Sequence, residues 1–169
     1  MKIIEALKKI KDLNIKASDL RDKIGAHSAD LNFETPLYPD QKATVDGWLQ
    51  AHHDITKEIL RLHTAVQKTN LATKVTMDLS DVNVTRTIAE WVLRRRLLAP
   101  MEMQAWAKLT DRNLREGYAS QSSGAQVEIR IRRYYDPKQR DEKVALYKSE
   151  PHTIDSTLEV FNAVTDLIE

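Results

Sequence analysis

Apolar residues recur at steps of three and four along several long stretches of the chain, a spacing typical of amphipathic helices. The first stretch extends from about Lys2 to Ile24, and the second begins near Asp40. A third begins near Asn83, a suitable N-cap, and we expect Pro100 to kink or break the helix there. The pattern predicts that this third stretch continues to about residue 117.

Two short segments alternate apolar and polar residues instead, which predicts strands. They are residues 75–79 and 127–131, and we expect the second to pair with the first or with its own copy in another subunit. The small polar residues from Tyr118 to Ala125 predict a mobile loop. A last helix is predicted to begin at Asp136 and Pro137 and to restart at Pro151.

Composition supports a mainly helical chain. The sequence is 41% hydrophobic and 30% charged, with only 4 glycines and 5 prolines in 169 residues. Such a composition favours long helices over a loop-rich or disordered chain. We therefore predict a mainly α fold of long antiparallel helical hairpins with a small two-stranded β element, in a single domain over residues 1–169.

Polar residues occupy the inner face of the second helix where its apolar stripe should continue. These residues are Thr69, Asn70 and Thr73, and a similar Asn-x-x-Thr segment, Asn162 and Thr165, ends the last helix. A buried amide or hydroxyl without a partner costs about 1 to 3 kcal/mol. The partners could be one another, ordered water or a ligand, and a frayed, solvent-exposed helix end is a further alternative.

Arginines supply the candidate positive charge. Residues 94–96 are three consecutive arginines, and three helical positions cover about 200° of the circumference. Arg95, four residues after Trp91, is predicted to approach the inner face, and Arg130 lies on the second predicted strand. A guanidinium fork suits phosphate or carboxylate. Internal ion pairs and a solvated face are the alternatives.

Several function classes are not expected. The net charge of +1 predicts no general attraction to nucleic acid or to an anionic membrane, and there is no cysteine. No glycine-rich phosphate-binding motif is present. His52 and His63, about 16 Å apart along a helix, are too distant to share one metal. We expect no enzyme, cofactor or metal. The charged start of the chain and the lack of a long apolar run predict a cytoplasmic protein.

Five short motifs occur in an order that resembles the septicolysin-like family, small and largely uncharacterised proteins of bacteria and phages. The matching segments are Glu5 to Leu7, Thr69 to Thr73, Val84 to Arg86, Glu128 to Arg130, and Asn162 to Leu167. The chain departs from the family pattern at Ala163, where the family has tryptophan, and near Gln126, where an arginine is missing. Residues 76–82 are additional. The resemblance implies that both Asn-x-x-Thr segments are part of the family pattern, which favours a shared polar site, and it implies no activity.

Two functions are predicted from these features. The first is a non-enzymatic, homo-oligomeric binding protein for a small anionic, nucleotide-like ligand, such as a nucleotide immune signal that a phage protein sequesters. Asn70 and Asn162 would bind a base or amide edge, the three threonines would bind hydroxyls, and Arg95 with Arg130 would neutralise the anion. The alternative is a structural or assembly protein in which the polar patch only fixes helix and subunit register. Nucleic-acid and membrane partners are not expected.

Overall fold

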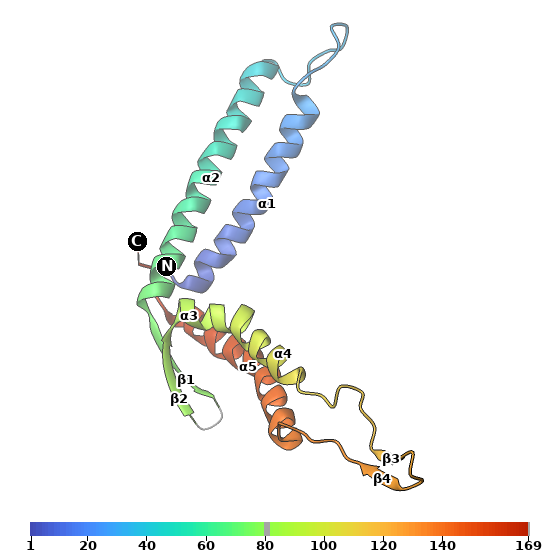
Figure 1. The fold of residues 1–169 in the computed structure, drawn as a ribbon. Coiled ribbons are helices and arrows are strands. Elements are labelled where there is room, and N and C mark those ends of the chain that lie inside the picture. The colour runs from blue at the N-terminus through green and yellow to red at the C-terminus, as the bar shows by residue number, and fades with distance from the viewer. Residues whose placement is uncertain (80–81, 169) are drawn as a thin grey trace. The chain divides into compact units, whose positions relative to one another are not determined.

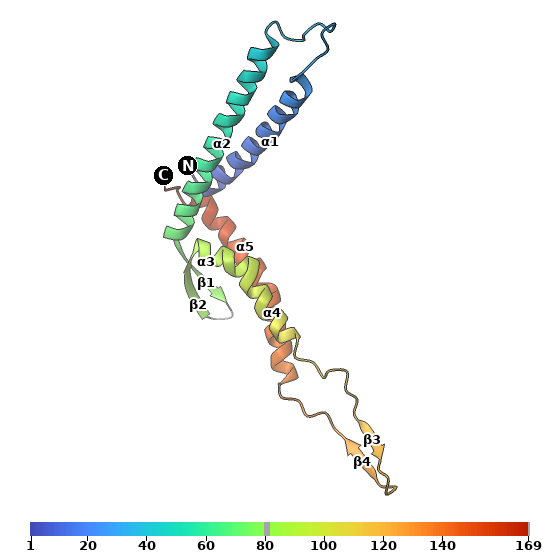
Figure 2. The ribbon, with the colours of Figure 1, turned by 45° about the horizontal axis from the view of Figure 1, so that its top comes forward.

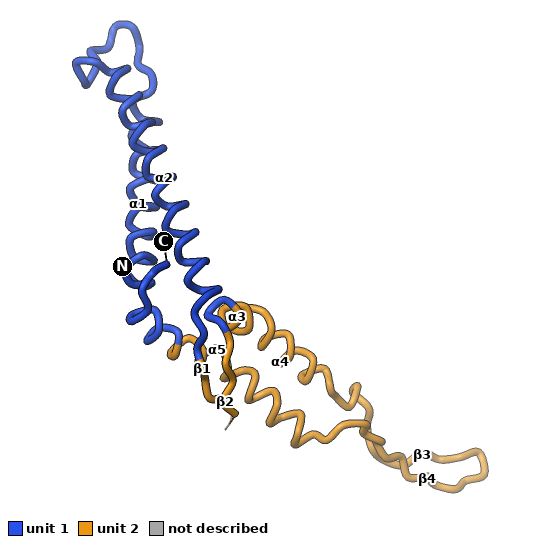
Figure 3. The backbone as a smooth tube through the Cα atoms, turned by 90° about the vertical axis from the view of Figure 1, so that its left-hand side faces the viewer, with its two compact units in different colours: residues 1–75, 87–89, 158–169 blue, residues 76–86, 90–157 orange. Residues whose placement is uncertain are grey.

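The fold is that of a computed structural model, and the description covers residues 1–79 and 82–168. Its contacts divide the chain into two compact units, coloured separately in Figure 3. Unit 1 comprises residues 1–75, 87–89 and 158–169, and unit 2 comprises residues 76–86 and 90–157. The described residues are mainly helical with two small strand pairs, which confirms the predicted fold class. The prediction of a single domain stays a prediction.

Unit 1 is built on a hairpin of two long helices, which lie side by side in Figures 1 and 2. Helix α1 spans Ile3–His27 and α2 spans Gln41–Ala72, in agreement with the apolar periodicity. The side chain of Asp40 caps α2 by accepting a hydrogen bond from the amide of Ala43. The helices bury a shared apolar cluster of Ala6, Ile10, Leu62 and Val66.

Charged and aromatic contacts hold the rest of this hairpin. Glu58 of α2 accepts hydrogen bonds from Arg61 at 2.8 Å and from Lys9 of α1 at 2.7 Å. These bonds, chiefly that from Arg61, lower the pKa of Glu58 to about 2. At the loop end, Tyr38 packs edge-on against Trp48 with ring centroids 5.4 Å apart.

A strand pair follows α2, and it corrects the predicted start of the third helix. Strand β1 spans Lys74–Leu79 and pairs with β2, Val82–Thr87, and the hydroxyls of Thr76 and Thr85 lie 2.7 Å apart. The helix predicted to begin near Asn83 begins instead at Ile88, as α3, Ile88–Leu93. The prediction failed because residues 82–87, which include two valines, form a strand when β1 lies beside them to pair with. The spacing of apolar residues along the chain does not show that β1 is the neighbour.

A π-helical segment, η1, Arg94–Leu98, joins α3 to α4, Ala99–Ala107. Since Pro100 has no N–H, the carbonyl four residues before it loses its α-helical donor, and the hydrogen-bond pattern changes on that turn. A π turn inserts one residue into the helical repeat. The fully buried position is therefore Ala99, whereas uninterrupted α-helical phase from Trp91 would bury Leu98.

The second strand pair lies in unit 2 and was mispredicted in part. Strand β3, Gly117–Ser120, pairs antiparallel with β4, Gln126–Ile129, so that Gly117 opposes Ile129 and Ser120 opposes Gln126. The strand near residue 127 is confirmed, but its partner is β3 and not residues 75–79. Of the loop predicted from Tyr118 to Ala125, residues 118–120 belong to β3, and residues 121–125 connect the two strands. The turn needs Gly124, whose φ of 80° is in the left-handed region.

Helix α5, Pro137–Val164, begins as predicted, because the carboxylate of Asp136 accepts the amide of Lys138 at 2.8 Å. The predicted restart at Pro151 is wrong, since the helix continues through this proline. Buried residues on either side, Glu150 and Ile154, hold the helix in place there. Among the helices of the described chain, none has the length and apolar character needed to cross a membrane.

Candidate functional site

The polar patch at the end of α2 is centred on Thr69, whose side chain is fully buried. Its hydroxyl donates a hydrogen bond to the carbonyl of Ala65 at 2.8 Å and accepts one from the amide of Ile168 at 2.9 Å. The inward phase predicted for Thr69 is thus correct. Because Ile168 lies 99 residues further along the chain, this hydroxyl ties the segment after α5 to α2.

Residues 165–168 lie beside the first residues of the chain. The amide of Ile3 donates to the carbonyl of Thr165 at 3.0 Å, and the amide of Leu167 donates to the carbonyl of Met1 at 2.8 Å. Lys2 pairs with Asp166 at 2.8 Å, and this hydrogen bond lowers the pKa of Asp166 below its ordinary value. Figure 1 shows both marked chain ends beside the lower end of α2. The Thr69 contact therefore belongs to a small closed arrangement of three segments.

Asn70 differs from Thr69, because part of its hydrogen-bonding capacity is unused. Its side chain is half-buried, and its Oδ1 atom is shielded from solvent without a hydrogen-bond partner among the residues that the structure describes. A carbonyl oxygen in this situation costs about 1 to 3 kcal/mol unless a donor reaches it. Asn70 therefore offers an acceptor for an N–H or O–H donor.

The other predicted Asn and Thr residues lie in the same unit. Thr73 caps α2, with its amide donating to the carbonyl of Thr69 and its own carbonyl accepting the amide of Ile88, both at 2.9 Å. Thr73, Asn162 and Thr165 are all half-buried. Unit 1 thus contains all five predicted polar residues.

The two predicted arginines lie in unit 2, and each contacts a carboxylate there. Arg95 pairs with Asp155 of α5. Arg130 pairs with Glu128 at 2.8 Å on the exposed β4 strand, and its side chain is 77% exposed. In both cases the positive charge is already neutralised locally, which is the alternative that the sequence left open.

Arg94, which was not singled out from the sequence, is the arginine that reaches deepest toward α5. Its side chain is 17% exposed, its Nε and Nη2 atoms lie 2.5 and 3.0 Å from the carboxylate of Glu150, and that carboxylate side chain is 3% exposed. The guanidinium also lies 5.6 Å from the ring centroid of Tyr147. Arg95 is also half-buried and contacts α5 through Asp155, but its side chain is 32% exposed, so Arg94 is the more deeply buried of the two.

A cluster around Asp111 was not predicted. Its carboxylate accepts hydrogen bonds from Arg133 at 2.8 and 2.6 Å and from the hydroxyl of Tyr135 at 2.8 Å. The bonds from Arg133 and Tyr135 lower the pKa of Asp111, and the carboxylate raises the pKa of the tyrosine. Arg112 and Asn113 have positive φ angles of 55° and 60°. The turn-forming residues at 110–113 were the available signal, but this segment was read as helix.

The Asp111 cluster borders a cavity of about 240 Å³ in unit 2. The polar groups of this cluster are largely bonded to one another. The cluster therefore joins the segment before β3 to the segment after β4. Within the described residues, no group of three or more histidines and carboxylates could hold a metal ion.

Comparisons with known proteins add the fold and no activity. No family model matches the chain, and no curated protein matches it. Membership of the septicolysin-like family thus stays a prediction. The chain is similar to a functionally unknown conserved protein from Corynebacterium diphtheriae, whose crystal structure matches with a TM-score of 0.62 at 18% identity. The match covers 99% of both chains, so the whole chain shares its fold with a bacterial protein whose function is unknown.

Proposed function

We propose that this chain is a non-enzymatic, homo-oligomeric binding protein, and that the polar patch around Asn70 binds the base or amide edge of a small nucleotide-like ligand. The shielded and unpartnered Oδ1 atom of Asn70 carries this proposal. A nucleobase edge supplies the N–H donor that this atom lacks, and a shielded acceptor discriminates strongly in favour of a ligand that donates to it.

The neighbouring residues limit what the patch can contribute. Thr69 uses its hydroxyl as both donor and acceptor within the protein. Thr73, Asn162 and Thr165 are half-buried and supply further hydroxyl and amide groups in the same unit. Arg95 and Arg130 already bind carboxylates, so the proposal rests on Asn70 and does not require them. The septicolysin-like family, which this sequence resembles, includes phage proteins. Sequestration of a nucleotide signal is therefore a concrete form of this function.

The experiment compares ligand binding by the wild type and by Asn70→Ala. Calorimetry and thermal melting with a panel of nucleotides and cyclic nucleotides should show binding by the wild type and its loss in the variant. Gln67→Ala is the matched control, because Gln67 is a carboxamide residue one turn earlier in α2 but is exposed. Binding that survives Asn70→Ala, or no binding of any nucleotide by the wild type, would overturn the proposal.

A structural role for the patch is the second candidate, and the hydrogen bond from Ile168 to Thr69 favours it. In this case the patch only fixes the register between α2 and the segment after α5. Native mass spectrometry of protein taken directly from cells separates the two functions. A bound small molecule adds mass to the chain, whereas a purely structural patch adds none.

A further inference from the structure

The outer face of α2 carries an exposed leucine at every eleventh residue. Leu49, Leu60 and Leu71 are 51%, 68% and 66% exposed. Eleven residues are close to three α-helical turns, so the three side chains lie on one face of the helix. The buried residues of α2, which include Leu62, Ala65 and Thr69, lie on the opposite face.

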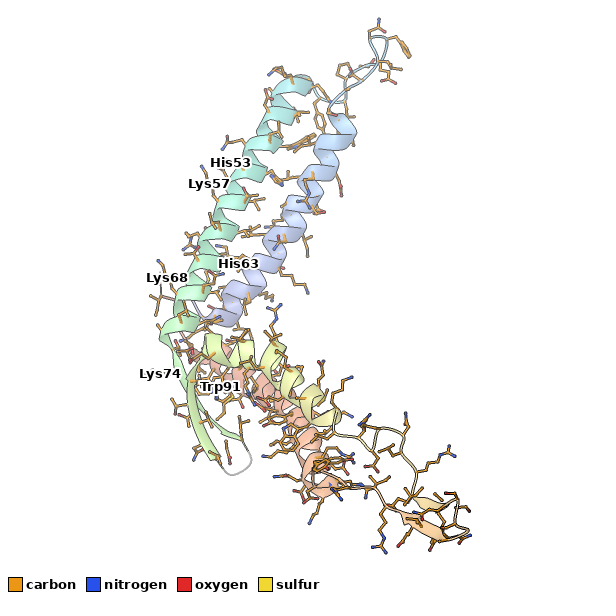
Figure 4. All side chains as sticks on the ribbon, viewed as in Figure 1. His53, Lys57, His63, Lys68, Lys74 and Trp91 are labelled. Atoms are coloured by element: carbon orange, nitrogen blue, oxygen red, sulfur yellow. The ribbon has the colours of Figure 1, made fainter. Side chains whose placement is uncertain are left out.

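The positions in line with the leucines are uncharged, and Lys57 and Lys68 flank them on the same outer side. Between the leucines, the same steps of three and four are filled by uncharged residues that are all exposed, namely His53, Thr56, Thr64 and Gln67. We call these seven residues the outer stripe of α2. It is about 33 Å long, from the rise of 1.5 Å per residue over 22 residues. Figure 4 shows His53, Lys57 and Lys68 on the side of α2 that faces away from α1.

The outer stripe is nearly symmetric about Leu60. Leu49 and Leu71 are each eleven residues from Leu60, and Thr56 and Thr64 are each four residues away. The remaining positions, seven residues away, hold His53 and Gln67. A two-fold axis places the same surface of two copies in contact, and an antiparallel helix pair inverts the residue order. Pairing about Leu60 would thus match leucine with leucine and threonine with threonine.

Charges beside the outer stripe favour the antiparallel arrangement. Asp54 and Lys68 lie on the same flank, six residues before and eight residues after Leu60. Antiparallel pairing about Leu60 places Asp54 of each copy two residues, about 3 Å along the helix axis, from the level of Lys68 of the other copy. Near the axis, the charge of Arg61 is already paired with Glu58 at 2.8 Å.

We propose that the outer stripe of α2 is a two-fold interface, at which a second copy of this chain packs antiparallel with Leu60 at the axis. This assigns a surface to the homo-oligomer of the proposed function, and it does not depend on ligand binding. Two α2 helices would bury six leucines, with a salt bridge between Asp54 and Lys68 at each end.

The test is Leu60→Lys, measured by light scattering and native mass spectrometry without nucleotide. The wild type should have twice the chain mass of 19.4 kDa, and the variant should have the mass of one chain. Leu60 is exposed within the protomer, so lysine should leave the fold and the circular dichroism spectrum unchanged. Val160→Lys, an equally apolar and 63% exposed position on α5, is the control and should remain dimeric.

Cysteine cross-linking tests the orientation, because the chain has no cysteine of its own. Leu60→Cys should cross-link to its own copy, and a mixture of Leu49→Cys and Leu71→Cys chains should cross-link to each other. Leu49→Cys alone should not cross-link, since its two copies would lie about 33 Å apart. A monomeric wild type, a dimeric Leu60→Lys or self-linked Leu49→Cys would overturn the interface. Asn70→Ala should leave the dimer intact, so loss of ligand binding and loss of the dimer are distinguishable.

Discussion

Replacing Arg94 with methionine should destabilise unit 2 strongly, whereas the same change at Arg95 should have little effect. Arg94 contacts the carboxylate of Glu150, whose side chain is only 3% exposed, through two hydrogen bonds of 2.5 and 3.0 Å. Arg94→Met leaves this buried charge without its partner, which typically costs about 3 to 5 kcal/mol. Arg95 pairs with Asp155, which is 53% exposed, and such pairs contribute about 0 to 1 kcal/mol.

Urea unfolding followed by tryptophan fluorescence measures this difference. A Trp48→Phe background leaves Trp91 and Trp106, both in unit 2, as the reporters. With a slope of about 1 to 3 kcal/mol per molar urea, Arg94→Met should lower the midpoint by at least about 1 M. Arg95→Met is the matched control, because it removes the same side chain from the next position.

A double variant separates the ion pair from the general loss of packing. Arg94→Met combined with Glu150→Met removes both charges, and replacing a buried pair by apolar residues is often neutral or stabilising. The double variant should thus recover most of the stability that Arg94→Met loses. Equal losses for Arg94→Met and Arg95→Met, or no recovery in the double variant, would refute the reasoning.

Three further predictions concern single contacts. Thr69→Val leaves the amide of Ile168 without an acceptor. It should lower the free energy of unfolding by about 1 to 3 kcal/mol and speed hydrogen exchange at the Ile168 amide, whereas Thr69→Ser should retain most of the stability and of the protection from exchange. The hydrogen bonds that lower the pKa of Glu58 from 4.5 to about 2 stabilise the α1–α2 hairpin above about pH 4.5, and this contribution is lost as the pH falls toward 2. Urea midpoints of Glu58→Gln across this range should lack that part of the pH dependence, and an unchanged pH profile would contradict it. Gly124→Ala should destabilise the β3–β4 hairpin by about 1 to 2 kcal/mol, because the φ of Gly124 is 80°. Gly25→Ala, within α1, should instead stabilise the chain. Thermal melting and limited proteolysis of both variants would show the difference.

The helical part of the fold was predictable from the sequence because its signals are local. The capping residues Asp40 and Asp136 precede helices whose apolar residues keep a constant phase. The strand β3 was missed because Gly117–Ser120 has no apolar alternation, and it becomes a strand by pairing with β4. Continuity through Pro151 was also missed, since the buried neighbours that hold α5 there are tertiary contacts.

Within the candidate site, burial was predictable but bonding was not. The phase of α2 places Thr69 inward, and the side chain is fully buried. Its partner Ile168 lies 99 residues away, and no pattern in either segment indicates the pairing. The Asp111 cluster depends on contacts over 22 and 24 residues and was missed for the same reason. Arg94 was not singled out, because helical phase alone did not show that its partner would be the buried carboxylate of Glu150, 56 residues away.

The two functions proposed for the polar patch can be tested separately, because the structural function depends on Thr69 and the ligand-binding function on Asn70. The hydroxyl of Thr69 already donates to Ala65 and accepts from Ile168, and the side chain is fully buried, so the proposed ligand site does not depend on it. Asn70, the next residue, has an acceptor that the protein leaves unused. A structural patch thus predicts that Thr69→Val is the more damaging change and that Asn70→Ala, which removes an unpartnered atom, costs little stability. A ligand site predicts that Asn70→Ala abolishes binding at unchanged stability, while Thr69→Ser binds as the wild type does.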